Sequence, residues 1–282
     1  MLSTFFKTKP VVDGASREWI FDTFTWCMDE LDGDFFQNNS ELILPNNTYY
    51  PGSSSSVEEM AETIFASTIK YAGMTSWPIT LVPAERFTQK PMPQLIFESR
   101  LRGENCKISA FEYFNISDDS NVIKNNDKIF PTIDIAFHQS QLNQPQDLIA
   151  YLVQNQANIL VTQHEHVAIG PKKSAPGGKN VQPQTIDLVA CFMGFGVIFA
   201  NTAYQFKGGC GSCNNSNLNR KSALPELETV YALALFCVVK NYGIKQVKKE
   251  LKSHLYKPFR QAHKEILLYL QETSNPAHSQ LK

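Results

Sequence analysis

One stretch constrains the fold of this chain most strongly: residues 148–161, LIAYLVQNQANILV, in which apolar side chains recur at helical spacing. The stretch contains no proline or glycine, so nothing in it should interrupt a helix. Three amides, Gln154, Asn155 and Asn158, occupy positions i, i+1 and i+4. Because side chains four residues apart are neighbours on a helix surface, Gln154 and Asn158 should share one face. The sequence therefore predicts a central apolar helix that carries a small cluster of amides.

Composition limits the range of partners. The chain has 282 residues, 43% of them hydrophobic, which suffices for one large domain or two small ones. Its formal net charge of −1 does not favour a nucleic acid or an anionic membrane as a partner. The longest apolar run, residues 188–200, holds two glycines and is shorter than the roughly 20 residues of a membrane span. Residues 1–10 lack the features of a signal peptide. We therefore expect a soluble, cytoplasmic protein.

The first part of the chain, residues 1–75, is predicted to be helical. Apolar residues recur at helical spacing over residues 16–31 and again over residues 57–71. A side chain that can accept a hydrogen bond precedes each helix, and a glycine follows it, as is typical of helix ends. The residues predicted to begin and end the helices are Ser16 and Gly33 for the first, and Ser56 and Gly73 for the second.

The middle part, residues 76–140, changes to short runs of β-branched and aromatic residues separated by turn-forming residues. Such runs are typical of strands and predict a small mixed or antiparallel sheet. The predicted strands are residues 79–82, 94–98, 108–114 and 132–137.

The last part, residues 145–272, returns to helical spacing, so the fold class is predicted as α+β and predominantly helical, with a single domain over residues 1–282. The central helix should begin at Pro145, and Pro258 should break the last helical segment in two. The other predicted helices cover residues 184–204, 224–242 and 244–272.

The order of several short motifs carries a resemblance. The chain shows Leu-Pro at 44–45 followed by Tyr-Pro at 50–51, then Asp-Leu at 187–188, Gly-Phe-Gly at 194–196 and Ala-Asn at 200–201. Together these motifs resemble those of a family of uncharacterised bacterial proteins that contain a zincin-like HExxH helix. The resemblance covers roughly residues 17 to 240, and the Leu-Pro to Tyr-Pro segment is one residue longer than the family's pattern. It implies a single zincin-like domain built around a zincin-like helix pair.

The resemblance assigns a former role to each amide of the central helix. Gln154 and Asn158 match the two histidine ligands of an HExxH motif, and Asn155 matches its general base. A neutral amide oxygen binds Zn²⁺ poorly, and an asparagine side chain does not titrate in the useful range. Amides can, however, hydrogen-bond one another within a buried polar cluster. On this interpretation the metal site is degenerate, although on their own the amides could equally form an ordinary polar helix face.

The third metal ligand is also missing. In the relatives an acidic residue shortly before the Asp-Leu pair completes the site, and this position corresponds to residues 182–184 here. Gln182 and Gln184 occupy it, and no carboxylate occurs between Glu165 and Asp187. Asp187 itself is expected to cap the start of its helix. In place of a metal, Gln154, Asn158, Asp187 and a neighbouring glutamine could hydrogen-bond one another. We therefore predict no catalytic residue, no metal and no cofactor, and a catalytically inactive, metallopeptidase-like protein that serves as a binding or structural module.

Two alternatives remain open. His164 and His166 could share a face if they lay in a strand, and could hold zinc in a metal-dependent hydrolase with an unidentified third ligand. Cys210 and Cys213, a CxxC pair, could complete such a site only if their loop folds back. The other alternative is a small-molecule or peptide binder that uses the former active-site cleft.

The C-terminal segment is basic and amphipathic. Such a segment usually forms a solvated helix face, and it could also contact an acidic protein partner. Its basic residues are Lys245, Lys248, Lys249, Lys252, Lys257, Arg260 and Lys264.

Overall fold

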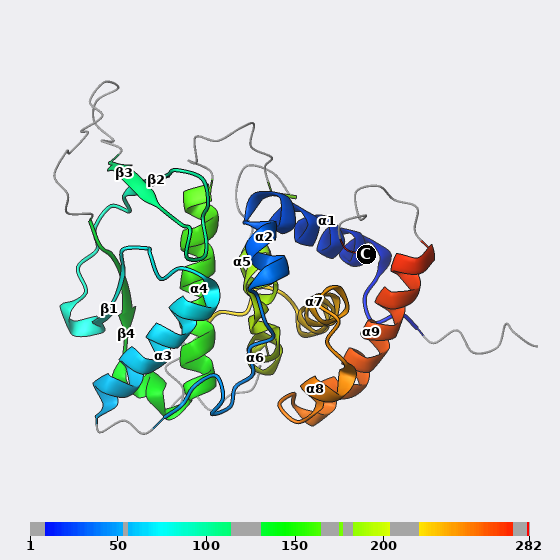
Figure 1. Cartoon of the computed structure of the whole chain (residues 1–282). Coiled ribbons are helices and arrows are strands. Elements are labelled where there is room, and N and C mark those ends of the chain that lie inside the picture. The colour runs from blue at the N-terminus through cyan, green and yellow to red at the C-terminus, as the bar shows by residue number, and fades with distance from the viewer. Residues whose placement is uncertain are drawn as a thin grey trace, which may run out of the picture.

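The computed structural model describes residues 9–52, 56–113, 131–164, 175–176, 183–203, 220–272 and 281. Figure 1 shows the arrangement of the helices and strands. The helices are α1 (Gly14–Glu30), α2 (Gly33–Asn38), α3 (Val57–Ala72), α4 (Pro145–His164), α5 (Pro183–Ala190), α6 (Gly196–Thr202), α7 (Glu226–Val239), α8 (Ile244–Lys248) and α9 (Ser253–Glu272). The strands are β1 (Ile79–Pro83), β2 (Gln94–Phe97), β3 (Ile108–Glu112) and β4 (Ile133–Phe137).

The predicted α+β, predominantly helical class is confirmed. The strands form two separate pairs rather than one small sheet: β1 runs parallel to β4, and β2 runs antiparallel to β3. Both pairs lie beside α3 and α4, whereas α7, α8 and α9 lie at the other side of the molecule (Figure 1). The parallel pairing of β1 with β4 joins segments about fifty residues apart, Ile79 lying opposite Ile133.

The ends of the first helices test the capping predictions. Ser56 caps α3 as predicted, because its Oγ accepts a hydrogen bond from the backbone N–H of Glu59 at 3.1 Å. Gly73 ends α3 in the left-handed conformation. The predicted start of the first helix is wrong, because the Asp13 carboxylate accepts a hydrogen bond from the Ser16 N–H and α1 begins at Gly14. Gly33 begins α2 instead of ending α1.

The helix predicted over residues 184–204 is kinked. α5 and α6 are joined by a π-helical turn, Cys191–Phe195, in which Gly194 has a φ of 101°. Its carbonyl oxygen accepts a hydrogen bond from the N–H of Ile43 at 3.0 Å, and a Cβ on Gly194 would lie 2.1 Å from the carbonyl oxygen of Glu41. The glycine therefore allows the segment before Pro45 to cross the kinked helix at close range.

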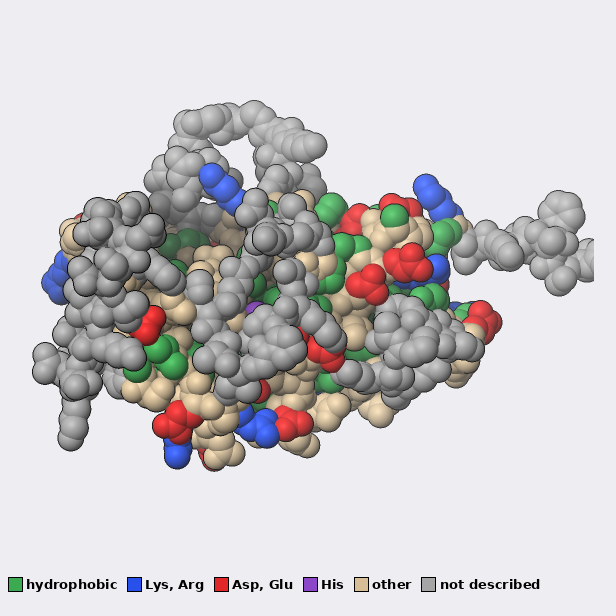
Figure 2. All heavy atoms as spheres, turned by 90° about the horizontal axis from the view of Figure 1, so that it is seen from above, with side chains coloured by type: hydrophobic (Ala, Val, Ile, Leu, Met, Phe, Trp, Pro, Cys, Tyr) green, Lys and Arg blue, Asp and Glu red, His purple; other side chains and the backbone are tan. Residues whose placement is uncertain are grey.

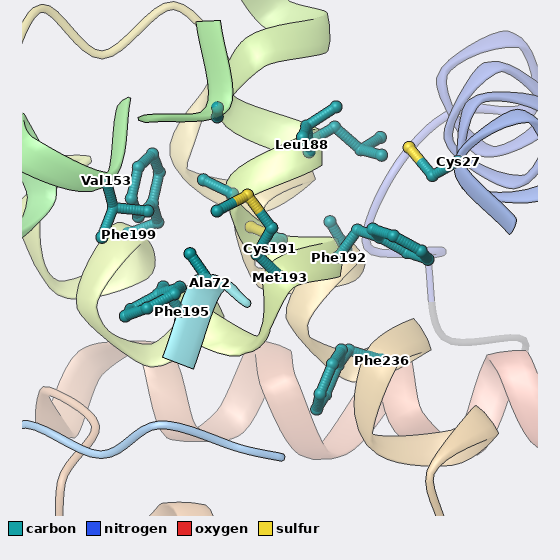
Figure 3. Close-up of a cluster of buried hydrophobic side chains, with 14 of the residues drawn as sticks. Cys27, Ala72, Val153, Leu188, Cys191, Phe192, Met193, Phe195, Phe199 and Phe236 are labelled. Atoms are coloured by element: carbon teal, nitrogen blue, oxygen red, sulfur yellow. The ribbon is translucent and has the colours of Figure 1, made fainter. Parts of the chain in front are cut away.

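The kinked helix forms the centre of the hydrophobic core. Residues 185–201 are all buried, and Figure 3 shows Phe192, Met193 and Phe195 in a cluster with Val153 of α4 and Phe236 of α7. By length and hydropathy (1.6) the Pro183–Thr202 segment could span a membrane, but 94% of its apolar window is buried inside the fold. Such burial is typical of the core helix of a soluble protein, with which the structure is compatible.

The predicted break at Pro258 is wrong, because Pro258 lies inside α9. The chain breaks earlier, between α8 and α9, where Asn201 of α6 binds the backbone. The Asn201 Nδ2 donates to the carbonyl oxygen of Glu250 at 2.8 Å, and its Oδ1 accepts from the N–H of Lys252 at 2.9 Å. Since Pro258 lies in the second turn of α9, it removes one hydrogen bond near the helix start without ending the helix.

Candidate functional site

The three amides singled out on α4 lie in three different environments. Gln154 and Asn155 are half-buried, whereas Asn158 is exposed. The Asn155 Nδ2 donates to the carbonyl oxygen of Tyr151 in its own helix at 2.8 Å. Among the described residues, Gln154 is the one of the three that bonds outside α4: its Nε2 donates to the Asp187 Oδ1 of α5 at 2.7 Å and to the carbonyl oxygen of Lys221 at 3.2 Å. Of the predicted cluster of Gln154, Asn158, Asp187 and a neighbouring glutamine, the described residues show only the Gln154–Asp187 contact.

Asp187 does not cap its helix, contrary to the prediction. It is the fifth residue of α5 and is completely buried, and its carboxylate is directed at the segment that leads into α7. The Oδ2 accepts hydrogen bonds from the N–H groups of Ala223 at 2.8 Å and Leu224 at 3.0 Å. The same oxygen lies 2.9 Å from the Arg220 Nη1 in an ion pair. Both carboxylate oxygens therefore have protein partners, so the role of Asp187 is to hold the 220–224 segment.

Arg220 is the buried cation that pairs with Asp187, and the sequence did not indicate it. Its side chain is 1% exposed, and its guanidinium lies over the Phe199 ring at 4.2 Å. The Nη2 donates to the carbonyl oxygen of Phe199 at 3.0 Å and to the Thr202 Oγ1 at 3.2 Å. A buried carboxylate requires such a cation nearby, because the cost of burying an unpaired charge is several kcal/mol, on the order of 3–5. A reader of the sequence would have to know that Asp187 is buried in order to expect a partner such as Arg220, and the sequence does not show that burial.

Gln184 lies one helical turn before Asp187 on α5 and is exposed. α4 and α5 pack against each other and run in opposite directions (Figure 1). Asp187 contacts Gln154, and the two helices are antiparallel. One turn forward on α4, at Asn158, therefore lies level with one turn back on α5, at Gln184. Gln154, Asn158 and Gln184 thus occupy facing turns of two antiparallel helices. Gln182, the other predicted position, lies outside the described residues.

His164 is part of the fold rather than of an open metal site. It is the last residue of α4, its side chain is 2% exposed, and its Nε2 lies 2.8 Å from the Glu30 Oε2. The Trp26 ring packs edge-on against its imidazole at 5.6 Å. His164 lies in a helix rather than in the strand that would place it on one face with His166.

The remaining candidates of the metal alternative, His166, Cys210 and Cys213, lie outside the described residues. Over the residues that the structure does describe, no group of three or more His, Cys, Asp or Glu side chains is placed to hold a metal ion.

Two further amides of α4, Gln156 and Gln163, are buried, and the sequence analysis did not single them out. The Gln163 Oε1 accepts from the N–H of Leu95 at 2.7 Å, and its Nε2 donates to the carbonyl oxygen of Pro93 at 2.8 Å, which anchors β2. The Gln156 Nε2 donates to the Thr68 Oγ1 of α3 at 2.7 Å. Their spacing of seven residues places them on one helix face and could have distinguished them from the other amides.

The surface next to Gln184 is slightly hollowed. A depression of about 400 Å³ lies between the start of α1, Gln184, and the start of α7, with Trp19 and Leu224 in its walls. Figure 2 views the molecule from the end at which α4 finishes and α5 begins, and acidic, basic and hydrophobic side chains are all visible there. The depression touches Gln184 but not the amides of α4, so it covers only part of the predicted cleft.

The basic residues of the C-terminal segment are exposed, as expected for a solvated helix face. One of them, Lys248, lies over the ring of Tyr256 at 5.4 Å and so joins α8 to α9.

Comparison of the chain with models of protein families, with curated proteins and with solved structures gave no match in any of the three.

Proposed function

We propose that this protein is a catalytically inactive, metallopeptidase-like protein that acts as a binding or structural module. The observation that carries the proposal is the hydrogen bonding of Gln154. At the position where the resemblance implies a histidine ligand, the Gln154 Nε2 donates to the Asp187 carboxylate at 2.7 Å. A metal ligand must present a lone pair, whereas this nitrogen presents its hydrogens.

The position of the general base supports the same proposal. Asn155 carries no group that could take a proton from a metal-bound water, and its Nδ2 is bonded to the Tyr151 carbonyl oxygen within α4. The hydrogen bonds of Gln154 and Asp187 instead stabilise the fold, because together they bind residues 220–224 ahead of α7. The former metal site would thus have become a hydrogen-bonded brace between α4, α5 and α7.

The setting that we propose for this module is the cytoplasm, with no nucleic acid or membrane partner. The exposed basic residues of α8 and α9 fit an acidic protein partner, because opposite charges favour encounter between two surfaces. Binding that weakens steeply as salt rises from low to physiological concentration would support this partner class.

Restoring the metal site tests the proposal. A variant with Gln154→His, Asn155→Glu, Asn158→His and Gln184→Glu would supply two imidazoles, a base and a carboxylate on the facing turns of α4 and α5. We expect this variant to hold zinc and to cleave unstructured peptides, and the wild-type protein to do neither. A matched variant that retains Asn155 should bind zinc without cleavage. Zinc-dependent cleavage by the wild-type protein would contradict the proposal.

A second candidate is a binder of small molecules or peptides at the former cleft, and the depression beside Gln184 favours it. The substitution Gln184→Trp would fill the depression while leaving Asp187 in place. Peptide binding that is lost in this variant, measured by fluorescence anisotropy, would support the second candidate, and binding that is unchanged would exclude the depression as the site.

A further inference from the structure

A second hollow lies on a different part of the molecule, where the segment around Tyr50 meets α3 and the start of α4. A cavity of about 290 Å³ is enclosed there by residues 45–52, by the first half of α3 and by the first turn of α4. The segment 45–52 overlaps the Leu-Pro to Tyr-Pro motif of residues 44–51, to which the proposed function assigns no role. A concave site of this kind, at the junction of separate elements, is typical of a ligand pocket.

The walls of this cavity are held in place before any ligand binds. The Asn46 Nδ2 donates to the Glu250 Oε1 at 3.1 Å, and its Oδ1 accepts from the N–H of Thr48 at 3.1 Å. The carbonyl oxygen of Asn46 accepts from the N–H groups of Tyr49 and Tyr50. Pro45 and Pro51 at the ends of the segment restrict the backbone further. A fixed wall lowers the entropy cost of binding.

The α3 wall exposes apolar surface at the mouth of the cavity. Ile64 is 6% exposed, but Met60, one turn earlier on the same face, is 39% exposed, and Val57 before it is 47% exposed. Ile149 of α4 contributes a further apolar side chain from the opposite wall. An apolar ligand body between Met60 and Ile149 would remove this surface from water.

The polar groups of the cavity are uncharged. No Asp, Glu, Lys, Arg or His lies among its described lining residues; the polar ones, apart from Tyr50, are Asn46, Asn47, Thr63 and Gln146. An ionised ligand would therefore give up its hydration without gaining an opposite charge.

One lining residue carries an unused hydrogen-bond donor. The Tyr50 hydroxyl is buried and makes no hydrogen bond within the described part of the chain. Burial raises the pKa of Tyr50 far above its usual value, so the phenol stays protonated and can donate. A buried hydroxyl without a partner is unfavourable. Because the hydroxyl has almost no accessible surface, a ligand oxygen reaches it when the Tyr50 ring turns toward the cavity.

We propose that the cavity bounded by residues 45–52, α3 and α4 binds a small, uncharged molecule with an apolar body and a carbonyl oxygen. The apolar body lies between Met60 and Ile149, and the carbonyl oxygen accepts the hydrogen bond of the Tyr50 hydroxyl. The site is separate from the amides of the metallopeptidase-like region, and the inference does not rest on the loss of a metal.

The test uses three probes of equal size: benzamide, which is neutral, benzoate, which is an anion, and benzamidine, which is a cation at pH 7. The full chain is labelled at the methyl groups of methionine and isoleucine, and each probe is titrated while the NMR signals of Met60, Ile64 and Ile149 are followed. We expect benzamide to shift these signals saturably and the two ions to bind at least roughly tenfold more weakly. Equal binding of all three probes, or no saturable shift with benzamide, would overturn the proposal.

Substitutions locate the binding. Met60→Trp should fill the cavity and weaken benzamide binding by roughly tenfold or more, whereas Leu268→Trp, at an exposed position of α9 outside the lining, should leave it unchanged. Tyr50→Phe keeps the ring and removes the hydroxyl, so we expect a loss of roughly three- to tenfold. Both tryptophan positions are exposed, so the variants should fold. Undiminished binding in Met60→Trp would overturn the proposed site, and undiminished binding in Tyr50→Phe would overturn the assigned hydrogen bond.

Discussion

The two helices that meet at Asp187 use their polar and glycine positions differently. On the kinked helix α5–α6, each of the motif residues Asp187, Gly194 and Asn201 makes a specific long-range contact. On α4, the predicted amides diverge: Gln154 reaches across to Asp187, whereas Asn158 is exposed. The Asp-Leu, Gly-Phe-Gly and Ala-Asn motifs of the kinked helix thus hold the scaffold together, whereas the three amides singled out on α4 are not all used by the fold.

The Asp187–Arg220 pair should give the largest effect. Asp187→Asn keeps the shape of the side chain but leaves a buried guanidinium without its counter-charge, so we expect a loss of about 3–5 kcal/mol in the free energy of unfolding. The control is Asp134→Asn, which removes a pair with the largely exposed Lys90 and should cost at most about 1 kcal/mol. Urea denaturation measures both, and equal losses would show that the Asp187 cluster does not hold the scaffold.

Gly194 comes next. An alanine there would need an unfavourable backbone conformation at a φ of 101°, and its Cβ would approach the Glu41 carbonyl oxygen to 2.1 Å. We expect Gly194→Ala to cost about 2–4 kcal/mol, since strain and overpacking add. Gly14→Ala, where the added methyl group meets nothing within 4 Å, should change stability by less than about 0.5 kcal/mol. Thermal unfolding followed by circular dichroism compares the two variants with the wild-type protein. A Gly194→Ala protein as stable as the wild type would argue against the kink.

The smallest effect distinguishes the amides of α4. Gln154→Ala removes a hydrogen bond to a buried carboxylate and should lower the free energy of unfolding by about 1.5–3 kcal/mol. Asn158→Ala, at an exposed position of the same helix, should stay within about 0.5 kcal/mol. The pair of variants is compared by urea denaturation under identical conditions. A large loss in Asn158→Ala would mean that the fold requires this amide and would remove the contrast between the two helices.

Much of the local structure could be predicted from the sequence. The helical spacing, the cap at Ser56 and the stop at Gly73 define α3, and the four β-rich runs fall on the four strands. Those features depend on residues close together in the chain. The parallel pairing of β1 with β4 could not be predicted, because it depends on contacts between distant segments.

The candidate site was predictable only in part, for the same reason. The sequence indicated a polar cluster that includes Gln154 and Asp187, and this contact is present. The burial of Arg220 depends on how the segment before α7 folds back onto α6. Asp187 is not a cap because α5 begins four residues earlier, at Pro183, and the buried carboxylate binds residues 220–224 instead. Pro258 likewise failed as a break because the Asn201 contacts set the end of α8.

The zinc content of the purified full chain tests the central claim most directly, measured by mass spectrometry of the metal after incubation with zinc and gel filtration. The wild-type protein should retain no stoichiometric zinc, and the variant with Gln154→His, Asn155→Glu, Asn158→His and Gln184→Glu should retain one ion per chain. One equivalent of zinc in the wild-type protein, lost on Gln154→Ala or on joint substitution of His166, Cys210 and Cys213, would contradict the account.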